Sequence, residues 1–324
     1  MNGSSSAAGL EILYYTESGD DLDLIREEAP ADWRFTTLVA GESSAERHEK
    51  LRRADVILHS EVKLLAPEIA AAERLKFVQR TGAGLDGLDV GALAERGIEV
   101  SISDAATVPV AEHAIMLMLA AGRRLGDIHF QVTGRAWPKW QFRPDVMGIE
   151  GRTVGIVGFG RIGQAVADRV LAMGAQVVVR RDSDRPLDER WTSRGVTTLA
   201  DPADLFAGCD FISLHCPLTE QTRGFVSEEL ISVMQPHAIL VNTARGALID
   251  EEALASALRA GRIGGAGLDV LSIEPAPSDH PLIGIRNVII TPHVATSSKD
   301  IDLVRAREMV RKIAQQFESR TDHS

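Results

Sequence analysis

The stretch TVGIVGFGRIG at residues 153–163 decides the fold of the region around it. Its first five residues predict a buried β-strand, three glycines in the spacing G-x-G-x-x-G come next, and residues 164–173 predict a helix. A second strand is predicted at 175–179. Glycine-rich turns also simply join elements, but a strand before this turn and a helix and a strand after it favour a dinucleotide-binding loop.

Each glycine of this loop has a separate physical task. The first permits a tight turn, the second lets the backbone approach a pyrophosphate, and the third lets helix and strand pack closely. The phosphates are expected at the N-terminus of the helix, where backbone N–H groups are free. The loop residues predicted to bind the dinucleotide are Gly158, Phe159, Gly160, Arg161, Ile162 and Gly163.

The end of the second strand indicates which nicotinamide dinucleotide is bound. An acidic residue at that point accepts hydrogen bonds from the adenosine ribose of NAD. This chain has Arg181 there, with Arg180 before it and Asp182 after it. An arginine can pair with a ribose 2′-phosphate through charge-assisted hydrogen bonds, so we favour NADP over NAD. In the alternative, the arginines form a solvated basic turn and Asp182 binds the ribose of NAD.

Three polar residues, Arg245, Glu274 and His293, each come after an apolar, strand-like run. Because parallel strands end along one edge of an open α/β sheet, where ligands bind, these side chains can meet in one cleft. An arginine can clamp a carboxylate, a histidine can move a proton, and a carboxylate beside a histidine favours its protonated form. The set suits redox chemistry on a 2-oxo or 2-hydroxy acid.

Each of the three also has a purely structural explanation. Arg245 could cap its loop or bind a cofactor phosphate, His293 could be a buried, hydrogen-bonded histidine, and Glu274 could lie in a surface turn. Their shared position after strands of one sheet, beside a cofactor motif, favours the joint functional interpretation. Structural roles are predicted for the other histidines considered, which are His113, His215 and His237.

Composition excludes several classes of protein. The net charge of −11 disfavours a general nucleic-acid or membrane-surface role, although a local arginine cluster still suits an anionic substrate. Cys209 and Cys216 are too few for a disulfide framework and indicate reduced thiols. No cationic-then-apolar leader is present, and no apolar run approaches about 18 residues, so we expect a cytoplasmic protein. No His/Cys/Asp cluster has metal-ligand spacing, so no metal site is predicted.

Strand-like and helix-like segments alternate from end to end, which predicts an α/β protein with two doubly wound parallel sheets. A long apolar helix is expected at 110–121, with Met116 and Met118 in the core. An irregular connection is expected at 126–150 and an amphipathic helix at 299–317. Strands are predicted at 10–15, 35–39, 56–59, 77–80, 99–101, 153–157, 175–179, 196–199, 211–215, 238–242, 264–270 and 287–291.

With these residues in hand, the chain resembles the D-isomer-specific 2-hydroxyacid dehydrogenases along nearly its whole length. The resemblance implies a discontinuous, flavodoxin-like substrate domain at 1–103 and 296–324, and a Rossmann domain for NAD or NADP at 104–295. It also implies a homodimer built on the helix at 110–121 and the loop after it. The segments that carry the resemblance are 81–86, 110–113, 158–163, 215–219, 242–246, 267–270 with Glu274-Pro275, and 291–293.

The same resemblance implies a role for each site residue. Arg245 would bind the substrate carboxylate, and His293, paired with Glu274, would be the general acid in reduction. The backbone N–H groups of Ala83 and Gly84 would complete the grip on the carboxylate. Further residues would line or tune the dinucleotide site, and they are Arg180, Arg181, Cys216, Pro217, Thr222, Thr243, Ala244, Arg245, Asp269 and His293.

The activity expected from the resemblance is reduction of a small anionic 2-oxo acid by NAD(P)H, with glyoxylate and hydroxypyruvate favoured. A phosphite-type dehydrogenase is an alternative, because an Arg/His cleft would also accept phosphite. A formate dehydrogenase is disfavoured, since such enzymes on this scaffold have Gln where this chain has Glu274. A third alternative is an NAD(H)-sensing interaction protein, like the corepressors that share the scaffold.

Overall fold

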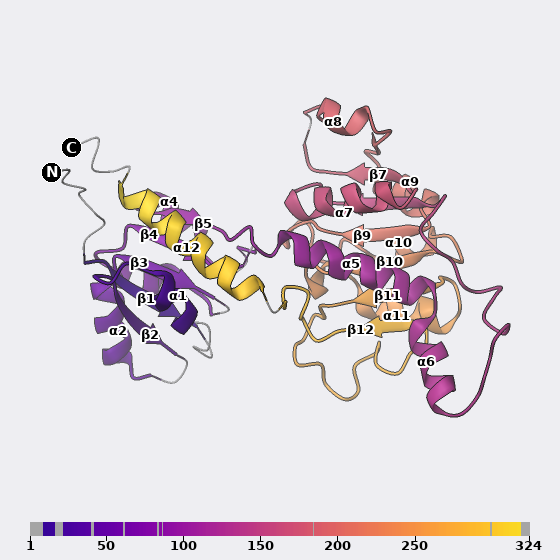
Figure 1. The fold of residues 1–324 in the computed structure, drawn as a ribbon, viewed down its shortest axis with the longest axis horizontal. Helices are drawn as coiled ribbons and strands as arrows, with labels where there is room; N and C mark the ends of the chain where they lie inside the picture. Colours follow the sequence, from indigo (N-terminus) through magenta and orange to yellow (C-terminus); the bar gives the residue numbers. More distant parts are fainter. Residues whose placement is uncertain are drawn as a thin grey trace. The chain divides into compact units, whose positions relative to one another are not determined.

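The computed structural model describes residues 9–16, 22–39, 42–60, 62–82, 84–85, 87–183, 185–298 and 300–318. The chain divides into two compact units (Figure 1). Unit 1 is Met1–Ala106 with Ser298–Ser324, and unit 2 is Thr107–Ser297. Each unit is built on a parallel β-sheet, as the alternation of strand-like and helix-like segments predicts.

The sheet of unit 1 has five parallel strands in the order β2-β1-β3-β4-β5, which is the flavodoxin-like order. All five lie within one residue of their predicted positions. Their bounds are β1 (Glu11–Tyr15), β2 (Arg34–Leu38), β3 (Val56–His59), β4 (Phe77–Arg80) and β5 (Glu99–Ser101).

Helices cover both faces of this sheet, and each face has its own apolar core. On one face α1 (Leu22–Glu28) packs beside α12 (Ile301–Glu318) (Figure 1). The predicted amphipathic pattern of α12 is confirmed by the burial of Met309 and Ile313, while Lys299 lies outside the described residues. The helices of the other face are α2 (Ser44–Arg53), α3 (Ala66–Ala71) and α4 (Val90–Glu95).

The sheet of unit 2 has seven parallel strands in the order β12-β11-β10-β9-β6-β7-β8. Strand order reverses between β6 and β9, and such a switch point is where doubly wound sheets bind ligands. The bounds are β6 (Thr153–Val157), β7 (Gln176–Arg180), β8 (Thr197–Thr198), β9 (Phe211–Leu214), β10 (Ile239–Asn242), β11 (Gly265–Leu268) and β12 (Val288–Ile290).

Helices again cover both faces. One face carries α5 (Thr107–Gly122) and α7 (Arg161–Ala172). The other carries α9 (Pro202–Gly208), α10 (Glu228–Ser232) and α11 (Glu251–Arg259). Shorter elements complete the unit, namely α6 (Leu125–Thr133), α8 (Glu189–Thr192) and the 3-10 turn η1 (Gly246–Leu248).

Helix α5 approaches the sheet closely because β11 has glycine where the two meet. A Cβ at Gly267 would lie 2.8 Å from the Cβ of Leu117, too near for any side chain. The prediction of a wholly buried helix is only partly right. Met118 is buried, but Met116 is 40% exposed, so the placement of Met116 in the core is wrong. In the described residues no helix has both the length and the apolarity to cross a bilayer.

The prediction of an irregular connection at 126–150 is wrong in its first part, since α6 occupies it. Arg124 adopts a left-handed conformation with φ 53° that ends α5, and its guanidinium binds Asp127 in the first turn of α6. None of the residues of α6 is buried. The helix is only nine residues long and contains Gly126, a poor helix former, which weakens its signal in the sequence.

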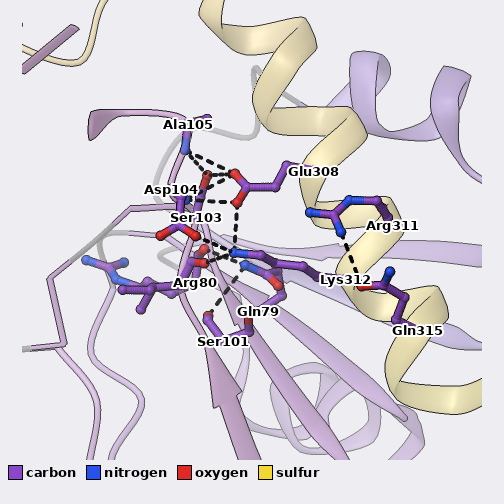
Figure 2. A network of polar contacts seen from close by, with 11 residues as sticks. Gln79, Arg80, Ser101, Ser103, Asp104, Ala105, Glu308, Arg311, Lys312 and Gln315 are labelled. Atoms are coloured by element: carbon purple, nitrogen blue, oxygen red, sulfur yellow. Dashed lines mark hydrogen bonds and ion pairs between the residues drawn. The ribbon is translucent and has the colours of Figure 1, made fainter. Parts of the chain in front are cut away.

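One carboxylate ties the segment after β5 to α12 within unit 1, and Figure 2 shows this contact. Glu308 accepts hydrogen bonds from the Oγ of Ser103 at 2.6 Å and from the backbone N–H groups of Asp104 and Ala105 at 3.0 and 3.1 Å. The Nζ of Lys312 lies 2.7 Å away. Burial alone would raise the pKa of Glu308, but these donors outweigh it and hold the pKa below its usual value.

We predict that Glu308→Gln lowers the unfolding free energy of the full chain by about 1–3 kcal/mol at neutral pH, because hydrogen bonds to a charged group are lost. Urea unfolding would measure it. A lowered folded-state pKa stabilises above the unfolded glutamate pKa of about 4.3, and that contribution disappears as the pH falls through the folded-state value. The penalty should therefore shrink in acid. Asp302→Asn, at a half-exposed position of α12, is the control, and a penalty independent of pH would contradict the charge argument.

Candidate active site

A pocket of about 570 Å³ lies at the carboxyl ends of β6, β7 and β9, beside the switch point of the unit 2 sheet. It contains eight of the residues predicted to bind the dinucleotide. Arg161, Ile162 and Gly163 begin α7 instead, and the residues from Thr243 onward are not in its wall. The lining residues are Val157, Gly158, Phe159, Gly160, Arg180, Arg181, Asp182, Ser183, His215, Cys216, Pro217, Thr219, Gln221, Thr222 and Phe225.

The three glycines of the loop differ in what surrounds them. Gly158 has φ +92°, and a Cβ there would lie 2.4 Å from the backbone nitrogen of Cys216. A Cβ at Gly163 would lie 2.2 Å from the carbonyl oxygen of Gly158. A Cβ at Gly160, by contrast, would meet no described atom within 4 Å. The first and third glycines are thus required by packing, while the second leaves open space that suits a pyrophosphate.

Two arginines line the part of the pocket at the end of β7. The guanidinium of Arg180 lies 5.1 Å from the ring centre of Phe225, a cation–π contact. The Nε atoms of Arg180 and Arg181 are buried, and neither has a hydrogen-bond partner within the described part of the chain. Donors of this kind fit an anionic group such as a phosphate. Asp182 is exposed beside them.

Neutral side chains line the pocket at the carboxyl end of β9. His215, predicted to be structural, hydrogen-bonds through Nε2 to the Oγ of Ser213 at 2.8 Å, and burial lowers its pKa to about 4. Burial raises the pKa of the Cys216 thiol. Both groups are therefore uncharged near neutral pH, and this side of the pocket adds no charge beside a dinucleotide.

Arg245 follows β10 in a loop that Asn242 shapes. The Asn242 side chain accepts a hydrogen bond from the N–H of Ala244 at 2.9 Å and donates one to the carbonyl oxygen of Arg245 at 2.8 Å. The Arg245 guanidinium donates to the Ala244 carbonyl at 2.7 Å. Gly246 then packs so tightly that a Cβ there would lie 1.9 Å from the carbonyl carbon of Leu271. The loop of Arg245 is thus adjacent to the loop that begins at Leu271.

Glu274 and His293 lie in direct contact. The Nδ1 of His293 is 2.6 Å from one carboxylate oxygen of Glu274, and the other oxygen accepts a hydrogen bond from the N–H of Leu271 at 2.8 Å. His293 has φ 55° and its side chain is 47% exposed. Because an ionised carboxylate can only accept, Nδ1 carries the proton in this pair, and Nε2 is left for a second partner.

Asp269, for which the resemblance implied a place near the nicotinamide, is buried outside the 570 Å³ pocket and holds the backbone next to His293. Its carboxylate accepts hydrogen bonds from the Oγ1 of Thr291 at 2.6 Å and from the N–H groups of Val294 and Ala295, each at 2.9 Å. Its carbonyl oxygen accepts from the N–H of His293 at 2.8 Å. The position of His293 therefore depends on Asp269.

His113 joins this network, and sequence reasoning gave it no role near the site. Its Nε2 lies 2.8 Å from the Oγ1 of Thr291 and 3.3 Å from the Oδ1 of Asp269. The available signal was its position on α5, three residues after Val110 and four before Leu117, which places it on the buried face. A largely covered histidine needs hydrogen-bond partners, because polar groups removed from water are normally satisfied.

The predicted substrate loop of unit 1 is only partly described. Ala83 lies outside the described residues, and the carbonyl oxygen of Gly84 accepts a hydrogen bond from the Nε of Arg80 at 2.8 Å. Among the described residues there is no group of three or more His, Cys, Asp or Glu side chains that could hold a metal ion.

A family model described as "D-isomer specific 2-hydroxyacid dehydrogenase, NAD binding domain" matches residues 115–295. The chain belongs to this family. D-3-phosphoglycerate dehydrogenase of Methanocaldococcus jannaschii is 41% identical over 81% of this chain and 50% of that protein. Hydroxypyruvate reductase of Thermotoga maritima is 38% identical over 80% of this chain and 83% of that protein.

The chain spans about half the length of the phosphoglycerate dehydrogenases that it matches. Among solved structures, an acyclic imino acid reductase in complex with NADPH and D-Arg superposes with a TM-score of 0.81 at 28% identity, covering 96% of this chain and 98% of that one. The matched family model is described as NAD binding and this solved structure contains NADPH, and the glycine loop and the pocket beside it fit a nicotinamide dinucleotide.

Proposed function

We propose that the protein is an NAD(P)-dependent D-2-hydroxyacid dehydrogenase that works mainly as a 2-oxoacid reductase. The observation that carries the proposal is the contact between His293 and Glu274 at 2.6 Å, in the same unit as a dinucleotide pocket. When bound, the nicotinamide dinucleotide supplies or accepts the hydride. The protein must bind the acid, orient it and move one proton.

His293 supplies that proton from Nε2 to the 2-oxo oxygen, and takes it back in the oxidative direction. Glu274 holds the ring through Nδ1, so Nε2 faces away from the carboxylate that orients it, and it stabilises the imidazolium. Arg245 binds the substrate carboxylate through two parallel hydrogen bonds, which its planar guanidinium provides and an ammonium does not.

Hydroxypyruvate and glyoxylate are the substrates that we favour. Support comes from the relative named hydroxypyruvate reductase, which is 38% identical over 80% of this chain. Hydroxypyruvate and glyoxylate are both small acids with one carboxylate beside a carbonyl. One arginine can bind the carboxylate, and one histidine can bind the carbonyl oxygen.

We expect turnover of glyoxylate or hydroxypyruvate, followed as loss of reduced-nicotinamide absorbance, and its loss in His293→Ala with unchanged cofactor affinity. Removing a positioned general acid costs about 10²- to 10⁴-fold in rate. His48→Ala, at an exposed position of unit 1, is the control.

The assay panel also includes 3-phosphoglycerate with the oxidised cofactor, and phosphite. Turnover of either, without reduction of the two favoured acids, would replace the proposed substrates. Tight cofactor binding without turnover of any compound would favour a nucleotide-sensing protein instead.

We also propose that NADP is preferred over NAD. The support is the pair of arginines at the end of β7, whose buried Nε atoms have no hydrogen-bond partner within the described part of the chain. A ribose 2′-phosphate brings two negative charges to that end of the pocket, and Arg181 stands where NAD enzymes of this fold have an acidic residue. The solved relative that binds NADPH supports the same cofactor.

Arg181→Asp should shift the ratio of kcat/KM for NADPH over NADH by about 10- to 100-fold towards NADH, because one charge-assisted interaction is replaced by repulsion. Steady-state kinetics with both cofactors measure the ratio. Arg286→Asp makes the same change of charge at an exposed position away from the pocket and should leave the ratio unaltered. An unchanged ratio in Arg181→Asp, with loss of NADH use in Asp182→Asn, would make Asp182 the ribose ligand.

A homodimer is the assembly that we propose, formed through α5, α6 and the segment after them. The support is a group of exposed aromatic rings on this part of unit 2, where Phe130, Trp137 and Trp140 are 72, 80 and 66% exposed. Exposed apolar groups of this size mark interaction surfaces. Cys209 and Cys216 are free thiols in the structure.

Sedimentation velocity should show two copies of the full chain, and the double variant Trp137→Glu, Trp140→Glu should sediment as a monomer. The two introduced glutamate carboxylates would be buried in the interface without partners, and this disfavours association. A wild-type monomer at micromolar concentration would refute the dimer.

A further inference from the structure

The loop that carries Glu274 is held by a second carboxylate, which plays no part in the chemistry proposed above. Glu251 is the first residue of α11, and the side chain of the preceding residue, Asp250, caps that helix by accepting from the N–H of Ala253 at 3.0 Å. The carboxylate of Glu251 is therefore not used as the cap. It is only 10% exposed and turns towards residues 272–280.

Two residues that bracket Glu274 in the sequence converge on Glu251. One carboxylate oxygen accepts a hydrogen bond from the N–H of Ser272 at 2.8 Å. The other accepts from the Oγ of Ser272 and lies 3.2 Å from the Nε2 of His280. Glu251 thus closes the loop by binding its two ends at one point.

The tautomer of His280 suits this contact. Its Nδ1 accepts a hydrogen bond from the N–H of Leu282 at 3.3 Å, and a backbone N–H can only donate. The proton of the neutral ring is therefore on Nε2, which donates it to Glu251. With its side chain only 3% exposed, His280 has both ring nitrogens satisfied and little freedom to move.

The start of the loop of Glu274, at Leu271 and Ser272, is also fixed by close packing against Gly246, which follows Arg245. A Cβ at Gly246 would lie 1.9 Å from the carbonyl carbon of Leu271 and 2.3 Å from the nitrogen of Ser272. Gly246 and Glu251 both belong to the short segment that follows Arg245. The loop of Glu274 is therefore positioned against the segment that follows Arg245 twice, once by close backbone packing and once by the largely covered carboxylate of Glu251.

We infer that Glu251 is a positioning residue that, with His280, holds Glu274 at hydrogen-bond distance from His293 and fixes the pair relative to Arg245. The inference rests on the proposed function, in which Glu274 orients His293 for proton transfer. A buried, hydrogen-bonded glutamate can also serve stability alone. If Glu251 positions Glu274, its loss lowers kcat through Glu274. If Glu251 serves stability alone, its loss leaves kcat unchanged.

The first test is kinetic. Glu251→Ala and His280→Leu should lower kcat by about 10- to 100-fold, the effect of a small misplacement of catalytic groups, while the dissociation constant of the reduced dinucleotide stays unchanged. His280→Gln should recover most of the rate, because its side-chain amide can donate where Nε2 did. Glu252→Gln, at the next and exposed position of α11, is the matched control and should behave as the wild type.

The second test asks whether Glu251 acts through Glu274. In a Glu274→Ala background, Glu251→Ala should lower kcat no further, because residues that act through one another are not additive. If the two losses multiply, Glu251 does not act through Glu274 and the inference is wrong.

A third measurement does not need turnover. The Nδ1 proton of His293, bonded to a carboxylate at 2.6 Å, should give a far-downfield proton NMR signal in the full chain, assigned by its absence in His293→Ala. The signal should persist in Glu252→Gln and disappear in Glu251→Ala. Where Glu251→Ala does not fold, Glu251→Gln and His280→Leu take its place.

The outcomes separate this inference from the proposed function. Normal kcat and an intact signal in Glu251→Ala, with only a lower melting temperature, would reduce Glu251 to a structural residue. Turnover that survives His293→Ala would overturn the proposed function, and the NMR signal would still show whether Glu251 holds the Glu274–His293 pair.

Discussion

The buried carboxylate of Asp269 is the interaction on which the candidate active site depends. It binds the hydroxyl of Thr291 and the backbone of Val294 and Ala295, so the end of β11 is joined to the segment after β12 that carries His293. A carboxylate buried in this way must have its oxygens satisfied, and here three donors and the nearby His113 do so. Moving His293 would break several of these bonds at once, which gives the histidine a fixed position although its ring is half exposed.

Glycines, which have no side chain, determine how closely the backbone segments of the site approach one another. Gly158 brings the loop after β6 against the backbone of Cys216, and Gly246 brings the segment of Arg245 against the loop of Glu274. Gly267 lets α5 lie close to β11, and His113 of α5 therefore lies beside Asp269. In each case a Cβ would overlap another atom, so these contacts fix backbone positions directly. Hydrogen bonds then orient the side chains within a frame that is already rigid.

The dinucleotide pocket and the Glu274–His293 pair are formed by different kinds of residue. The dinucleotide pocket is lined by backbone, neutral side chains, two arginines and Asp182, and the proposed cofactor preference rests on the arginines at the end of β7. In the proposed proton-transfer pair, Glu274 contacts His293, and Glu251 binds the loop around Glu274.

Much of the fold could be predicted from the sequence, because its signals are local. The G-x-G-x-x-G loop, the strand-like runs and the amphipathic α12 follow from composition and spacing over a few residues, and the contact of Glu274 with His293 was expected from their positions after neighbouring strands. The helix α6, the exposure of Met116 and the roles of His113 and Glu251 were not predicted. They depend on which surfaces meet in three dimensions, and burial and long-range hydrogen bonds leave no periodic trace in the sequence. Local propensity therefore determined the elements, and tertiary packing decided which polar residues they brought together.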